Sequence, residues 1–320
     1  MALSGSWDIS ATRTIIVEAA LRKLGVLAEG QTANSNAVTI AAEALNFMIK
    51  SWQAEGMPVW YLKTGFIYPI ENDENLSLGP GGDHWSEELI LTKLTNNATS
   101  GTSTITISIT AATDVVGTIA DSDNIGIEMD DGSIHWTTVS AGGGTATLTL
   151  TAATDDTANS SNRVFAYTTK AQRPLSVEGA WRVDAVTADR VDISPVSMSE
   201  MLSQTNPTDE GVPLMYNYQG TLTTGSFRYW PRFQNGDTYI ELLFQHPFDD
   251  IDAATNNPAF PDEWIEALIY GLAVRLAPEY ALPLQERILL KGEAQTMKDR
   301  ALLSTDEDSS IQIQPAMLNG

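Results

Sequence analysis

Carboxylates are the most abundant side chains in this sequence that could do chemistry. The segment DSDNIGIEMDDG, residues 121–132, begins with the spacing of a calcium-binding loop. Such a loop needs an oxygen ligand at its fifth position and a bidentate glutamate at its twelfth. Ile125 and Gly132 occupy those two positions. We therefore interpret the segment as an acidic hairpin that faces water.

A second acidic group, in HPFDDID, combines a histidine with three aspartates in seven residues: His246, Asp249, Asp250 and Asp252. Imidazole and carboxylate groups at this density can hold a metal ion. A loop that precedes a helix is just as acidic for reasons of solubility, and we favour that interpretation. We therefore expect neither a metal nor a cofactor.

Nucleophilic catalysis has little support in the sequence. It contains three histidines, His84, His135 and His246, no cysteine and no GxSxG motif. The glycine-rich LGPGGD, residues 78–83, lacks the Lys-Ser/Thr that follows a phosphate-binding loop, so we expect a turn there. A hydrolytic enzyme is therefore the least favoured class, and we predict that the protein is not an enzyme.

The charge balance constrains the partners. The chain has 320 residues, with 18 Lys+Arg against 41 Asp+Glu and a net charge of -23. Such a chain repels polyanions, which argues against a grip on nucleic acid through its phosphates. No run of 18 apolar residues is present, so we expect no contact with a membrane. The stretch from Leu94 to Asn162 contains no Lys or Arg, as an inserted segment of different origin would.

Helical periodicity marks both ends of the chain. Val17, Leu21 and Leu24 recur at helical spacing after the possible caps Ser10 and Thr12, and Gly25 ends the run. A second helix is predicted to open near Ser35 or Asn36 and to close at Gly56. It carries an apolar stripe of Val38, Ala41, Ala42, Leu45, Met48, Ile49 and Trp52. Pro261 marks the start of a third helix, and a fourth is expected from about Pro283 to Leu303.

The period changes to two in the middle of the chain. The phrase TITISITAATD at residues 104–114 returns as TATLTLTAATD at 145–155, and both alternate apolar residues with Thr or Ser. A repeat array needs at least three units, so we interpret the two copies as strands of one module. They flank a hairpin predicted to turn at Asp131-Gly132, and a second β region is expected from about Arg173 to Pro247.

These elements predict an α+β protein. An antiparallel helical bundle forms from the N- and C-terminal segments, and a central β region carries a small inserted β-sandwich or barrel. We expect a helical domain made of residues 1–70 and 251–303, and a central β domain made of residues 71–93 and 171–250. Residues 94–170 form the Thr-rich insert, and residues 304–320 form a flexible C-terminal tail.

The helix in DEWIEALIYGLAVRLAPEYAL, residues 262–282, is apolar nearly all round. Between Trp264 and Ala277 its only charged residues are Glu266 and Arg275. Such a helix is buried on several sides. We expect the first two helices and the β region to cover part of it, and a neighbouring subunit to cover the rest. The predicted core and oligomer interface comprises Trp52, Trp60, Trp264, Leu268, Leu272 and Leu276.

Aromatic residues also cluster in FRYWPRF, with Phe227, Tyr229, Trp230 and Phe233. A sugar-binding platform uses such residues, but core packing and subunit interfaces use them more often.

Three segments carry a resemblance to a known family: LRKLGVLAEG (21–30), LNFMIKSWQAEGMPVW (45–60) and PDEWIEALIYGLAVRLAPEYAL (261–282). In their order and motifs the chain resembles the head-to-tail adaptor, or connector, proteins of tailed bacteriophages, in the packaged-DNA-stabilisation and tail-tubular-A-like group. The likeness covers residues 10–70 and 171–303, and the 94–167 module is extra. These motifs serve packing rather than catalysis.

The resemblance implies a structural virion protein at the head-tail junction, made in the host cytoplasm. It implies a dodecameric ring of identical subunits that binds the portal protein and a tail nozzle or tail tube component. Double-stranded DNA would pass through its channel without sequence-specific binding. Portal contacts would come from the C-terminal tail, through Ile311, Ile313 and Met317. The alternative is a tail-associated module that binds a receptor or glycan through the inserted β segment.

Overall fold

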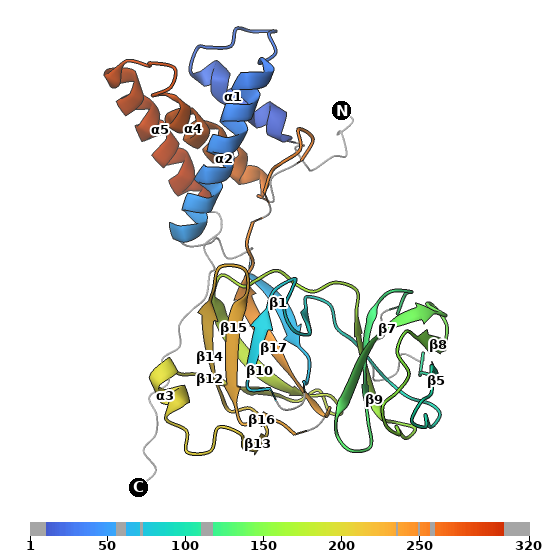
Figure 1. The fold of residues 1–320 in the computed structure, drawn as a ribbon. Helices are drawn as coiled ribbons and strands as arrows, with labels where there is room; N and C mark the ends of the chain where they lie inside the picture. The colour runs from blue at the N-terminus through green and yellow to red at the C-terminus, as the bar shows by residue number, and fades with distance from the viewer. Residues whose placement is uncertain are drawn as a thin grey trace, which may run out of the picture. The chain divides into compact units, whose positions relative to one another are not determined.

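The computed structural model describes residues 11–55, 62–70, 73–109, 118–234, 236–248, 250–256 and 260–303. The chain divides into two compact units. One combines residues 1–61 with 248–320 and is helical, and the other, residues 62–247, consists of β-sheets (Figure 1).

The helical unit contains the predicted helices. Thr12 caps the first one through its side chain, which accepts a hydrogen bond from the backbone N–H of Ile15, and Gly25 follows it with a φ of 70°. The second helix is capped by Asn34, one residue before the predicted opening, because its Oδ1 accepts a bond from the N–H of Ala37. The helices of the unit are α1 (Arg13–Lys23), α2 (Ser35–Glu55), the 3₁₀ turn η2 (Asp262–Trp264), α4 (Ile265–Leu276) and α5 (Leu284–Leu303).

Helix α4 is the centre of this unit. The other three helices, α1, α2 and α5, all pack against it. Along α4 only Glu266 and Arg275 are exposed, and Ile265, Ile269, Tyr270 and Val274 stay partly exposed. Helix α5, which was not among the expected covering elements, buries much of α4, and the expectation that a neighbouring subunit covers the rest stays a prediction.

The β unit holds two facing sheets with one core between them. Their strand orders are β11-β10-β17-β1-β3 and β12-β14-β15-β2, and β13 and β16 form a small parallel pair. The strands are β1 (Leu62–Ile67), β2 (Asn75–Leu78), β3 (Trp85–Ser86), β10 (Val177–Asp184), β11 (Arg190–Asp192), β12 (Ser194–Pro195), β13 (Glu210–Gly211), β14 (Met215–Gly220), β15 (Gly225–Trp230), β16 (Arg232–Phe233) and β17 (Thr238–Gln245). The short helix α3 (Met198–Leu202) packs against β14 and β15.

Aromatic side chains fill the core between these two sheets. Trp85 and Phe244 come from the first sheet, and Phe227 and Tyr229 come from the second. Phe233 is buried in the same core. The aromatic residues of FRYWPRF therefore serve packing, apart from Trp230, and do not form a sugar-binding platform.

A third sheet is built from the inserted segment and from one strand, β4, that directly precedes it. Its strands are β4 (Ile90–Lys93), β5 (Thr104–Thr106), β6 (Asn124–Glu128), β7 (Ile134–Ala141), β8 (Thr147–Leu150) and β9 (Arg163–Tyr167), in the order β4-β9-β6-β7-β8-β5. The predicted hairpin is confirmed, because β6 and β7 pair around a turn in which Gly132 has a φ of 90°. The sheet curls back on itself, because Leu94 and Ile107 form a bridge between its two ends.

The two copies of the repeated phrase pair with each other. Strands β5 and β8 are antiparallel neighbours, and Ile105 lies opposite Leu148. Both apolar side chains are buried in the core of the curled sheet, whereas the threonines beside them point away from it. The repetition thus reflects two strands that share one environment in one module.

The predicted fold class is wrong. We expected a helical bundle with a β region attached, yet the described residues are mainly β-sheet, with seventeen strands in four sheets and a minority of helix. The physical reason is that the β segments bury three clusters of their own, so they need no helix to cover them.

An aromatic cluster joins the curled sheet to the larger sheet beside it. Tyr68 stacks on Tyr167 with ring centres 5.0 Å apart, and His84 stacks on Trp136 at 3.8 Å. The Nδ1 atom of His84 lies 2.7 Å from the hydroxyl of Tyr167. Because rings from both sheets interlock, this cluster fixes the orientation of the curled sheet within the β unit.

Protonation of His84 is expected to destabilise this aromatic cluster. Burial, aided by the charge of Lys170, lowers the pKa of His84 from 6.5 to about 4. The folded protein therefore favours the neutral ring. The free energy of unfolding is unaffected by His84 above pH 6.5 and decreases as the pH falls from 6.5 towards 4, because the unfolded chain binds a proton that the folded protein does not. The shift corresponds to about 3 kcal/mol of unfolding free energy. Urea unfolding at a series of pH values measures this loss.

The variant His84→Asn is the control, because an amide can bond the Tyr167 hydroxyl without ionising. We expect its stability to fall less than that of the wild type between pH 6.5 and 4. Carboxyl groups contribute equally to both proteins, so the difference isolates His84. Parallel curves for the two proteins would contradict the assignment.

Candidate assembly interface

Four of the predicted interface residues lie in the interior of the helical unit. Leu268, Leu272 and Leu276 are fully buried in its main core, and Trp264 is buried beside Ala267 and Ala301. Trp60, Ile311, Ile313 and Met317 lie outside the described residues, so the portal contact expected of the last three stays a prediction.

Trp52 and Trp264 meet in an aromatic cluster. Their ring centres are 5.9 Å apart in an edge-to-face arrangement, and Phe260 lies 5.7 Å from Trp264. The ammonium group of Lys298 lies 5.1 Å from the centre of the Trp52 ring and donates to Glu55 at 2.5 Å. A cavity of about 140 Å³ opens beside this cluster. Lys298 is paired with the Glu55 carboxylate, and this pair connects the end of α2 to α5.

The outer face of α5 exposes large apolar side chains near its N-terminal end. Leu284, Ile288 and Leu289 are 71%, 63% and 69% exposed, although they belong to the first two turns of a long helix. Phe47, on α2, is 67% exposed. We call Leu284, Ile288 and Leu289 the α5 ridge. A ridge of this kind is costly in water and is typical of a surface that another protein covers.

Sequence reasoning missed the ridge because α5 has no clear apolar stripe. Its buried positions, Leu290 and Ala301, are few, and leucines occur on several of its faces. The one available signal was the run Ile288-Leu289-Leu290, in which a single helix cannot bury all three side chains against one neighbour.

The three histidines have structural partners. Beyond the bond from His84 to Tyr167, His135 Nδ1 lies 2.8 Å from Asp155, and His246 Nε2 lies 2.9 Å from Glu87. Burial raises the pKa of Glu87, but hydrogen bonds from His246 and Lys63 outweigh it and hold that pKa below its ordinary value. The partners of His135 are the carboxylate of Asp155 and the carbonyl of Ala152, 3.5 Å from its Nε2, and neither is a hydroxyl or thiol nucleophile.

The acidic groups considered for metal binding are dispersed. Asp250 pairs with Lys50 at 3.0 Å, and Asp252 accepts a bond from Asn256 at 2.9 Å. Asp249 lies outside the described residues. In the part of the chain that the structure describes, no group of three or more histidine, cysteine or acidic side chains has the geometry of a metal site.

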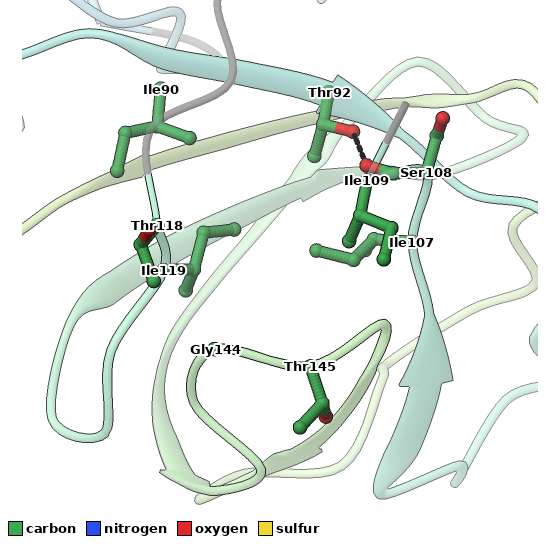
Figure 2. Close-up of a pocket in the computed structure, with 9 residues that line it drawn as sticks. All are labelled: Ile90, Thr92, Ile107, Ser108, Ile109, Thr118, Ile119, Gly144 and Thr145. Carbon is green, nitrogen blue, oxygen red and sulfur yellow. Dashed lines mark hydrogen bonds between the residues drawn. The ribbon is translucent and has the colours of Figure 1, made fainter. Parts of the chain in front are cut away.

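A cavity of about 180 Å³ lies in the curled sheet (Figure 2). Ile107, Ile109 and Ile119 surround it, with Thr145 across the opening, and Thr92 Oγ1 donates to the carbonyl of Ser108 at 2.6 Å. All the lining residues that the structure describes are Ile, Thr, Ser or Gly. Since none of them ionises near neutral pH, this lining supplies no general acid or base.

None of the helices in the described ranges has the length and apolar character that a membrane span requires. Comparison of the chain with protein-family models and with curated proteins finds no match.

Proposed function

We propose that this protein is a structural subunit of a phage virion, which assembles through its helical unit into a ring at the head-tail junction. The observation that carries the proposal is the α5 ridge, three apolar side chains exposed on a helix whose opposite face packs on α4. Contact between ridges and neighbouring subunits removes this surface from water, which stabilises association. The resemblance of residues 10–70 and 171–303 to head-to-tail adaptors supports the same proposal.

The partners follow from the same proposal. The ring binds the portal protein on one side and a tail nozzle or tube component on the other, and double-stranded DNA passes through it. A net charge of -23 supports this role, because a channel wall that repels phosphates lets DNA slide without sticking. The subunit is made in the host cytoplasm and acts in the virion, without catalysis.

Glycan binding by the inserted segment is the alternative function, and the cavity of Figure 2 is where a sugar would enter. Protein sites for sugars commonly stack a ring on an aromatic side chain, and the described residues that line this cavity include none. We therefore favour the adaptor.

Sedimentation with the portal tests the proposal. The purified chain, mixed with the assembled portal protein of the same virus, is expected to sediment with it as a complex of defined stoichiometry. A chain that stays monomeric and unbound at micromolar concentrations of both proteins contradicts the proposal.

A further inference from the structure

A hollow of about 220 Å³ lies on the outer face of the sheet β12-β14-β15-β2, beside α3. Phe227 and Tyr229 of β15 point into the core, so the alternating residues Arg228 and Trp230 belong to the opposite face. Met201 and Leu202 of α3 line the same hollow, and Leu202 is 65% exposed. The hollow therefore combines a cation with an apolar wall.

Arg228 supplies the positive charge of the hollow. Its side chain is half-buried, and within the described ranges no carboxylate or carbonyl lies in hydrogen-bond or ion-pair range of its guanidinium. Glu74 also lines the hollow, but Arg232 holds this carboxylate at 3.0 Å. A guanidinium prefers a planar acceptor that takes two parallel hydrogen bonds, as a carboxylate does.

The neighbouring groups narrow the choice of ligand. The Trp230 indole is held by a bond of 2.8 Å from its Nε1 to the carbonyl of Asn206, which fixes the ring beside Arg228. The ring, Met201 and Leu202 together form an apolar wall. A simple inorganic anion is too small to contact this wall while it binds Arg228. A ligand that fits both parts carries an apolar group next to its carboxylate.

We propose that this hollow binds an extended peptide segment of a partner protein, through an aspartate or glutamate on Arg228 and an adjacent aromatic or aliphatic side chain against Trp230 and Leu202. Local charge complementarity supports such a partner, because Glu74, the acidic residue in the lining of the hollow, is paired with Arg232 and leaves the charge of Arg228 available to a carboxylate. This binding goes beyond ring assembly and does not depend on it.

Fluorescence anisotropy of labelled peptides tests the proposal on the full chain. The probes are fluorescein-labelled Gly-Asp-Phe-Gly-amide and Gly-Phe-Asp-Gly-amide, each with a counterpart that has Asn in place of Asp. We expect at least one aspartate peptide to bind at least about tenfold more tightly than its counterpart, since a charge-assisted bond is lost with the amide. The variant Arg228→Gln is expected to abolish this preference.

Two further variants separate the site from general effects. Leu202→Asp places a carboxylate at the exposed rim, where it leaves folding intact, and is expected to weaken binding at least about tenfold by repulsion. Arg173→Gln removes a cation elsewhere on the β unit and is expected to leave the binding of all the peptides unchanged.

Equal binding of the Asp and Asn peptides, an unchanged preference in Arg228→Gln, or no binding by either aspartate peptide would overturn the proposal. Displacement of the peptide by inorganic phosphate at equal concentration would reduce the hollow to a general anion site and overturn the claim of a peptide partner.

Discussion

Replacing Leu268 or Leu272 with aspartate is expected to unfold the helical unit. Both side chains are fully buried in α4, at the centre of the unit, where α1, α2 and α5 surround them. Loss of the leucine alone costs about 2–5 kcal/mol. Desolvation of an unpaired carboxylate adds several kcal/mol, and the sum reaches the whole stability of an ordinary domain, about 5–15 kcal/mol. Circular dichroism at 222 nm during urea unfolding measures the effect.

The matched control places the same residue on the exposed side of the same helix. Glu266 is exposed, and Glu266→Asp keeps an acid in the first turn of α4, where it suits the helix dipole. We expect this variant to stay within about 0.5 kcal/mol of the wild type. If Leu268→Asp and Leu272→Asp were as stable as Glu266→Asp, the central position of α4 would be incorrect.

Charges on the α5 ridge are expected to abolish assembly and to leave the fold intact. In the double variant Ile288→Glu/Leu289→Glu, both substituted side chains are more than half exposed, so the stability of the subunit stays within about 1 kcal/mol of the wild type. Burial of two unpaired carboxylates at a subunit contact is expected to weaken association at least a hundredfold, or about 2.7 kcal/mol. Analytical ultracentrifugation over a range of concentrations measures the change.

The control for this variant is Gln295→Glu/Thr296→Glu, which adds the same two charges two turns further along α5. Both positions are exposed and polar, and they lie outside the apolar ridge. This protein is expected to assemble as the wild type does. If the two double variants assembled equally well, the α5 ridge would not be part of the subunit interface.

Helix positions were predictable from the sequence because their signals are local. The stripe from Val38 to Trp52 repeats over several turns, and α2 forms around it. Thr12 caps α1 through its side-chain oxygen, Pro261 has the backbone φ that suits a helix start, and helical segments begin directly after each of them.

The balance between helix and sheet was not predictable in the same way. Strands such as β3, β12, β13 and β16 contain two residues each, too few to show any period. Their positions depend on partners far along the chain, as when Trp85 of β3 pairs with Ile67 of β1. The core that makes the β unit the larger part of the fold therefore forms from contacts that local sequence does not encode.

The residues of the candidate interface could not be identified from the sequence, for a different reason. Leu268 and Ile288 are both apolar residues in predicted helices, and composition does not distinguish the buried one from the exposed one. The packing of α5 on α4 decides it, because this contact buries Leu290 and leaves Ile288 and Leu289 on the outside.

A reconstruction of the chain bound to its portal by electron cryo-microscopy tests the central claim most directly. The account predicts a closed ring of high rotational symmetry, coaxial with the portal, in which Leu284, Ile288 and Leu289 of each subunit are covered by the next. Particles that show the portal alone, with the chain monomeric in solution, would contradict it.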